Sequence, residues 1–139
     1  MRTLNAALLF VAVGLAAITT APHLAGAQSP PVTNLAGQEI RATIWTGDHA
    51  QDHIWRFRAG GAVSGLYTGL SNVGELAHAV EGSDTGTWSA RGETVCIQWR
   101  AWFDRARTCY RIERTKGIWF EASPVGGGRP IKGTLTPYR

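Results

Sequence analysis

Residues 86–110 constrain the fold most, because they contain both cysteines of the chain and three of its six tryptophans. In residues 95–100 apolar side chains alternate with the others, and residues 109–113 repeat this alternation after a polar connection at residues 103–107. Such alternation is typical of an antiparallel strand pair with one buried face. The face that we expect to be buried carries Val95, Ile97, Trp99, Tyr110 and Ile112.

The two cysteines fall on the opposite face of this predicted hairpin. Cys96 and Cys109 would lie on neighbouring strands, where the Cα separation that a disulfide needs is available. The register stays open at this point, because the two cysteines are not equidistant from Asp104 in the expected turn. We expect a disulfide, worth up to about 3 kcal/mol, with two free buried thiols as the alternative.

The first 27 residues have the pattern of a signal peptide. Arg2 supplies the positive charge, residues 6–18 are small and apolar, and Ala-Gly-Ala at residues 25–27 matches the site that signal peptidase cuts. We expect cleavage after Ala27 and a periplasmic or secreted protein, a compartment in which a disulfide persists. An uncleaved N-terminal anchor is the alternative. Nothing else is apolar enough to span a membrane, for which roughly 20 residues are needed.

After the cut, residues 28–34 are expected to form a flexible tail and residues 35–139 a single domain. Alternating segments recur between Gly-rich turns, for example at residues 40–45, 53–59, 62–70 and 131–138. About eight short strands of this kind predict an all-β fold, a small antiparallel up-and-down barrel, or else a small sandwich. Gly65 and Gly69 suggest a bulge or strong bending.

Residues 71–84 do not fit this strand pattern. We expect them to form a long connection that could hold one turn of helix over residues 75–80. The Gly-rich residues 124–130 lack the Lys-Ser/Thr ending of a phosphate loop and are interpreted as a turn.

The charge pattern argues against nucleic acid as a partner. The chain has 14 basic and 10 acidic residues, and twelve of the basic ones are arginines scattered along the expected strands. Solvated strand faces explain this pattern better than an anion-binding patch. We expect a monomer.

Aromatic residues give the first functional hypothesis. An eight-stranded barrel holds side chains or one small ligand, and Trp45, Trp55 and Tyr67 are candidates to surround its mouth. We therefore expect a non-catalytic binding protein for a small apolar or anionic ligand. Tryptophans that merely fill the core are the alternative.

Histidines give a second hypothesis. His49 and His53, beside Asp48 and Asp52, would bind zinc or copper, together with His78 from the long connection. Aspartates that bond their own backbone in a turn are the alternative. No cofactor is expected, and no nucleophile motif is recognisable, so we do not expect an enzyme.

The motifs Gly86-Thr87-Trp88, Cys96-x-x-Trp99 and Cys109-Tyr110, which follow Phe57-Arg58-Ala59-Gly60-Gly61 and Gly65, resemble a domain family of unknown function. Its members are small exported proteobacterial proteins, and the resemblance covers most of residues 28–139. It implies a signal peptide, one disulfide and a small β-barrel, and brings no catalytic residues.

A looser similarity concerns bacterial periplasmic inhibitors of metalloproteases, which are lipocalin-like. It rests on size, export, a single disulfide and the expected barrel, and is a fold-level analogy. In that family the N-terminal segment enters the protease cleft, which makes residues 28–35 the counterpart here. A protein-binding module of this kind is the third hypothesis.

Overall fold

The computed structural model describes residues 29–47, 49–73 and 76–139. The expected signal peptide, residues 1–27, therefore lies outside the described residues, as does Asp48 of the expected metal site. Within the described part of the chain, no helix has the length and apolarity to cross a membrane.

The described chain is built of eight β-strands and one short 3-10 turn. In chain order these are β1 (Gln38–Thr46), β2 (His49–Phe57), β3 (Ala62–Val73), β4 (Leu76–Arg91), β5 (Thr94–Trp99), η1 (Phe103–Arg105), β6 (Arg107–Lys116), β7 (Trp119–Pro124) and β8 (Ile131–Pro137).

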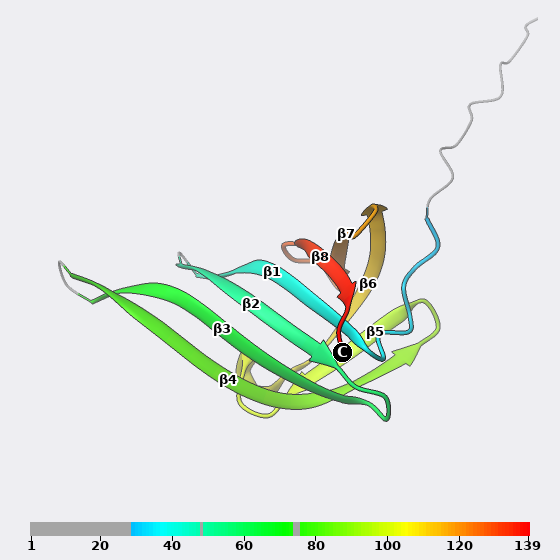
Figure 1. The fold of residues 1–139 in the computed structure, drawn as a ribbon, viewed down its shortest axis with the longest axis horizontal. Helices are drawn as coiled ribbons and strands as arrows, with labels where there is room; N and C mark the ends of the chain where they lie inside the picture. Colours follow the sequence, from blue (N-terminus) through cyan, green and yellow to red (C-terminus); the bar gives the residue numbers. More distant parts are fainter. Residues whose placement is uncertain (1–28, 48, 74–75) are drawn as a thin grey trace, which may run out of the picture.

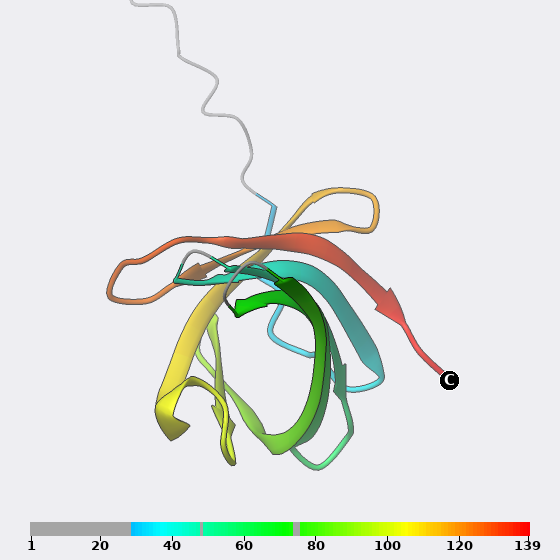
Figure 2. The ribbon, with the colours of Figure 1, turned by 90° about the vertical axis from the view of Figure 1, so that its left-hand side faces the viewer.

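Every strand pairs antiparallel with the next one, and β8 pairs with β1 to close the barrel. Figure 1 shows the strands side by side, and Figure 2 looks into the barrel from the end where the β3–β4 hairpin projects. The prediction of an all-β, up-and-down barrel with about eight strands is confirmed. Closure pairs the strands all around the sheet, which a sandwich of two sheets would not do.

Alternation along the strands produces the core. In β5 the predicted buried face is confirmed, since Val95, Ile97 and Trp99 are all almost fully buried. β1 alternates likewise between inward Ile40, Ala42 and Ile44 and outward arginine and threonine. The remaining large core residues come from most other strands and from the N-terminal segment: Leu35, Trp55, Phe57, Val63, Ile112, Phe120, Ile131 and Leu135.

The disulfide between Cys96 and Cys109 is confirmed, with a bond of 2.03 Å between the two sulfur atoms. The cysteines lie directly opposite each other in β5 and β6, which fixes the register that the sequence left open. The bond therefore links neighbouring strands that the hydrogen-bond ladder already joins.

The expected connection over residues 71–84 is wrong. These residues extend β3 and begin β4, which pair residue by residue from Val73↔Leu76 down to Ala62↔Thr87. Helix-favouring residues such as Leu76 and Ala77 are held extended because register with a long partner strand overrides local propensity. The result is a long curved hairpin that projects beyond the rest of the barrel (Figure 1).

The N-terminal segment joins the barrel before β1 begins. The Val32 amide donates a hydrogen bond of 2.7 Å to the Ile112 carbonyl, and the Leu35 side chain is fully buried. The Asn34 side chain accepts a hydrogen bond from the Ala36 amide. The last residues of the expected tail thus contact the barrel wall.

The two ends of the barrel differ. Along β2 the inward side chains go from exposed His49, through half-buried Gln51, to His53 and finally to fully buried Phe57. The apolar core therefore fills the end near Phe57, and the inward residues Gln51 and His53 are polar toward the opposite end. We call that opposite end the mouth of the barrel.

Candidate functional site

A pocket of about 350 Å³ opens at the mouth. Strands β1, β2 and β3 form one side of it, and the β5–β6 loop, residues 100–106, forms the other. We call it the mouth pocket; its lining residues are Thr46, Gln51, His53, Tyr67, Ala101, Trp102, Phe103 and Asp104.

His53 is the buried polar residue of this pocket, with 3% of its surface exposed. Its Nδ1 accepts a hydrogen bond of 3.3 Å from the Trp55 indole, and its Nε2 lies 3.3 Å from the Gln51 side-chain oxygen. This network assigns the neutral tautomer with the proton on Nε2, which donates to Gln51. Burial lowers the pKa of His53 to about 4, against the opposing effect of the Asp52 carboxylate.

Both ring nitrogens of His53 are therefore occupied by neighbouring side chains. A general base needs a free lone pair within reach of the proton that it takes, and Nδ1 has given its lone pair to Trp55. The arrangement makes His53 a fixed, uncharged polar group within the pocket.

Aromatic rings surround His53. The centroids of Trp102, Tyr67, Trp55 and Phe103 lie 5.4, 5.6, 6.0 and 6.1 Å from the imidazole centroid. Tyr67 and Trp102 lie 5.5 Å apart across the pocket lining. Trp102 in turn packs on core Trp99 at 4.7 Å, which connects the pocket to the apolar interior.

The β5–β6 loop carries two of these rings on an unusual backbone. Phe103, Asp104 and Arg105 have φ angles of 50°, 56° and 59°, in the left-handed region that residues other than glycine seldom adopt. Each such residue costs on the order of 1 kcal/mol or more, so the surrounding structure must hold the loop in place.

Asp84 of β4 supplies part of that support. One carboxylate oxygen accepts hydrogen bonds of 2.8 Å from the Ala101 and Trp102 amides, and the other accepts one from the Thr85 amide. Burial on its own would raise the pKa of Asp84, but these amides and the nearby Arg100 outweigh it and hold the pKa below the usual range. The ionised carboxylate thus ties the loop to β4.

Two glycines make room for the rings. A Cβ at Gly65 would overlap the ring atoms of Trp102 and Trp99, so Trp102 packs directly on the β3 backbone. A Cβ at Gly82 would lie 2.6 Å from the Tyr67 ring, its cross-strand partner. Gly65 is paired regularly with Trp55 and Asp84, so it produces space for Trp102 and no bulge.

The structure separates the three residues predicted to bind a ligand. Tyr67 lines the mouth pocket, whereas Trp55 is a core residue with 2% exposure that packs behind the lining residues His53 and Phe103. Trp45 points outward, is 52% exposed, and lies under the Arg129 guanidinium at 5.5 Å.

The residues predicted to bind a metal are also dispersed. His49 and His53 are both inward on β2, but four strand residues span about 13 Å, too far for both to bind one ion. Asp52 points outward and accepts a hydrogen bond from Thr43. His78 lies on β4 opposite Ser71. No group of three metal-binding side chains occurs among the described residues.

Sequence reasoning missed Gln51, Trp102, Phe103 and Asp84. Phe103 is the first residue of the predicted hairpin turn and Trp102 precedes it, and two adjacent large aromatics at an otherwise polar turn are a signal that such a turn covers something apolar. Nothing local marks Asp84, whose partners lie on another strand connection.

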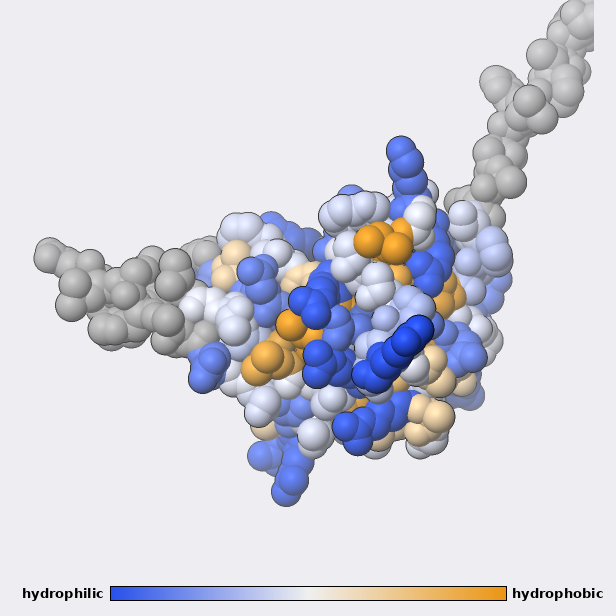
Figure 3. Space-filling view, in the orientation of Figure 1, coloured by the Kyte–Doolittle hydropathy of each residue, from blue (hydrophilic) through white to orange (hydrophobic). Residues whose placement is uncertain are grey.

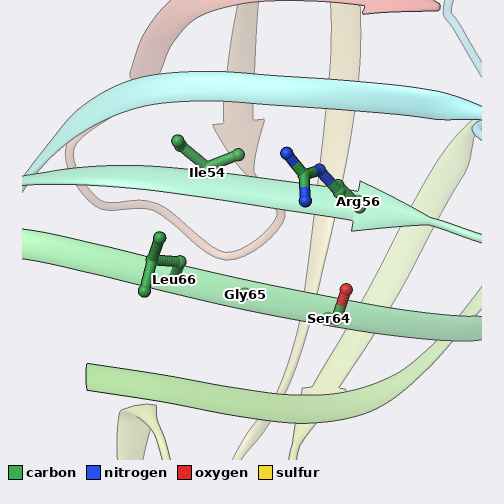
Figure 4. Close-up of a pocket in the computed structure, with 5 residues that line it drawn as sticks. All are labelled: Ile54, Arg56, Ser64, Gly65 and Leu66. Atoms are coloured by element: carbon green, nitrogen blue, oxygen red, sulfur yellow. The ribbon is translucent and has the colours of Figure 1, made fainter. Parts of the chain in front are cut away.

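The outer wall offers a smaller depression between β2 and β3, with a volume of about 170 Å³ (Figure 4). Ile54, Arg56, Ser64 and Leu66 line it from the outward faces of the two strands. Arg56 is already paired there with Glu39, which also binds Arg41. In Figure 3 hydrophobic groups on this face are interspersed with hydrophilic ones, so it presents no continuous apolar patch.

The mouth pocket therefore combines a buried neutral histidine, three half-buried aromatic rings and a braced loop. No family model, no curated protein and no solved structure matches this chain.

Proposed function

We propose that this protein binds a small molecule in the mouth pocket and performs no chemistry on it. The observation that carries the proposal is the environment of His53, a buried polar group encircled by aromatic rings beside an open volume of about 350 Å³. Apolar walls with a few fixed polar groups are typical of ligand sites, and this volume suits a small ligand.

The loop geometry supports the same proposal. A left-handed stretch costs free energy, and such strain concentrates where a chain positions functional groups. Here the left-handed stretch begins at Phe103, directly after Trp102, and both of these residues line the pocket. The fixed tautomer of His53 favours binding over proton transfer.

We also propose that the protein is exported and that it belongs to the exported family whose motifs it resembles. The pattern of residues 1–27 supports export. The Cys96–Cys109 disulfide is compatible with an oxidising compartment.

The binding proposal is tested with neutral probes that fit the pocket. Purified protein is titrated with 3,3-dimethylbutan-1-ol and with 4-tert-butylphenol, and binding is followed by saturation-transfer NMR of the probe. We expect saturable binding that Tyr67→Ala and Trp102→Ala abolish, because both substitutions remove pocket wall.

Trp45→Ala is the matched control, since it removes an aromatic side chain of the outer wall. It should leave binding unchanged. If neither these probes nor choline and 3,3-dimethylbutanoate bind saturably, or if all variants bind alike, the mouth pocket is not a ligand site.

A further inference from the structure

We infer that the mouth pocket selects an organic cation, a compact ammonium group with an apolar body. This inference rests on the proposed binding function and specifies its ligand class. It is carried by the juxtaposition of three aromatic residues, Tyr67, Trp102 and Phe103, with the acidic residue Asp104 in the lining of the same pocket.

The charge of the pocket lining disfavours an anionic ligand. Among the described residues that line it, Asp104 alone carries a charge at neutral pH. The basic residues Arg100 and Arg105 belong to the same loop but do not line the pocket. An anion would therefore meet a carboxylate and no cationic partner, which is unfavourable in a partly desolvated site.

The remaining lining groups suit a cation. Tyrosine, tryptophan and phenylalanine rings attract a cation over their faces, and trimethylammonium ligands are bound by such aromatic groupings. The Gln51 and Thr46 side chains bring oxygen acceptors to the same rim. His53 stays uncharged at neutral pH, so it does not repel a cation.

The net charge of +4 does not oppose this inference. Basic residues such as Arg41 and Arg56 lie on outward strand faces and are more than half exposed. Salt screens such charges beyond about 8–10 Å, whereas Asp104 belongs to the pocket lining itself. The local charge of the pocket therefore decides which ligand binds.

The test compares three probes of one shape. Choline carries a trimethylammonium group, 3,3-dimethylbutan-1-ol replaces its nitrogen by carbon, and 3,3-dimethylbutanoate is an anion with the same tert-butyl group. Dissociation constants are measured by NMR titration with the purified protein. We expect choline to bind at least roughly tenfold more tightly than the alcohol, and the anion to bind most weakly.

Asp104→Asn is the diagnostic variant. Asparagine tolerates the left-handed backbone at this position, so the loop should keep its shape. We expect choline affinity to fall about fivefold while alcohol affinity stays the same. Glu93→Gln is the matched control, because it removes one negative charge from the β4–β5 turn at the far end of the barrel. It should change neither affinity.

The outcomes separate the two proposals. If the alcohol binds as tightly as choline, or if the anion binds best, the pocket is a ligand site but the inferred cation selectivity is wrong. The same holds if Asp104→Asn leaves choline binding intact. If no probe binds, both the cation selectivity and the proposed binding function fail.

Discussion

His53 shows at the scale of one residue how this barrel accommodates a polar group in its interior. The imidazole loses its hydration on folding, and the two hydrogen bonds to Trp55 and Gln51 replace it only for the neutral ring. A proton on Nδ1 would leave Trp55 without an acceptor and place a charge among aromatic rings. Protonation and folding therefore oppose each other.

This opposition predicts how stability depends on pH. The pKa of His53 is about 4 in the folded protein and 6.5 when unfolded, so the unfolded chain binds more protons between these values. The free energy of unfolding should fall by up to ~3 kcal/mol as the pH drops from 6.5 to 4. Urea denaturation at pH 7 and pH 4.5 measures this difference.

His53→Gln should reduce the pH dependence of the free energy of unfolding, whatever its effect on stability at pH 7. His49→Gln is the control, because His49 is exposed at the strand end and its loss should leave the dependence unchanged. Equal pH dependence in the His53 variant and the wild type would show that another group is responsible.

Asp84 gives a second prediction at this scale. Asp84→Ala removes three hydrogen bonds to a carboxylate and should lower the free energy of unfolding by about 2 kcal/mol. Glu81→Ala, at an exposed position of the same strand, should change it by less than about 0.5 kcal/mol. Urea titrations of the two variants measure both changes. Similar losses in the free energy of unfolding would refute the role of Asp84 in holding the β5–β6 loop.

At the scale of elements, the β5–β6 loop depends on strands that are not its neighbours in sequence. Its amides bond to β4 through Asp84, and its Trp102 ring lies on β3 at Gly65. The loop is thus shaped by two strands of the long β3–β4 hairpin. Substitutions in that hairpin should therefore alter the shape of the mouth pocket even at positions that do not line it.

Gly65→Ala tests this dependence. The added methyl group overlaps Trp102 and Trp99, so we expect a loss of about 2 kcal/mol and a shift of tryptophan emission toward that of an exposed indole. Gly69→Ala is the control on the same strand, because its methyl group meets the flexible Gln51 side chain at 3.0 Å. It should cost much less, and equal losses would contradict the proposed packing of Trp102.

At the scale of the whole molecule, strand pairing continues around the complete barrel, and one disulfide lies within it. The bond closes a loop with a sequence separation of 13 residues. In the chain-entropy model this restricts the unfolded chain and contributes about 3 kcal/mol. In the native barrel, backbone pairing also joins β5 to β6 on both sides of the two cysteines.

Replacing both cysteines by alanine should therefore lower the free energy of unfolding by about 3 kcal/mol and keep the β-sheet circular dichroism spectrum. Reduction of the wild type should have a similar effect on the urea midpoint. Loss of the β-sheet signal without denaturant would instead mean that the barrel requires the bond.

The proposed export can be tested through the mass of the protein recovered from cells. Cleavage after Ala27 would leave Gln28 as the first residue, and the disulfide would lower the mass by two hydrogens. Denaturing mass spectrometry measures both. A chain that still begins at Met1 would contradict cleavage.

The sequence predicted the parts of this fold that depend on local periodicity. Alternation in residues 95–100 and 109–113 predicted the hairpin and the buried face of β5, because period-2 burial is visible along a single strand, whereas Tyr110 of the second strand is only half-buried. The disulfide was expected from the two cysteines sharing a face, and the structure supplied its register. The hairpin over residues 71–84 was missed because its glycines and alanines give little contrast between the two faces.

The mouth pocket was harder to predict. Its lining depends on which side chains of the barrel wall point inward and on contacts between segments that are distant in the sequence. Trp45 and Tyr67 looked alike in the sequence, yet one points outward and the other lines the pocket. His53 was singled out for a metal, whereas its neighbours in space are aromatic rings. Strand alternation separates His53 from Asp52 but does not reveal what lies across the barrel.

The packing of Trp102 on Gly65 also makes these two positions epistatic. A side chain at position 65 overlaps both Trp102 and Trp99, so Trp102→Leu should relieve the part of the damage caused by Gly65→Ala that arises from the Trp102 ring. A double-mutant cycle would measure this coupling energy. Among homologues, drift at one site should then be permitted only after a compensating change at the other.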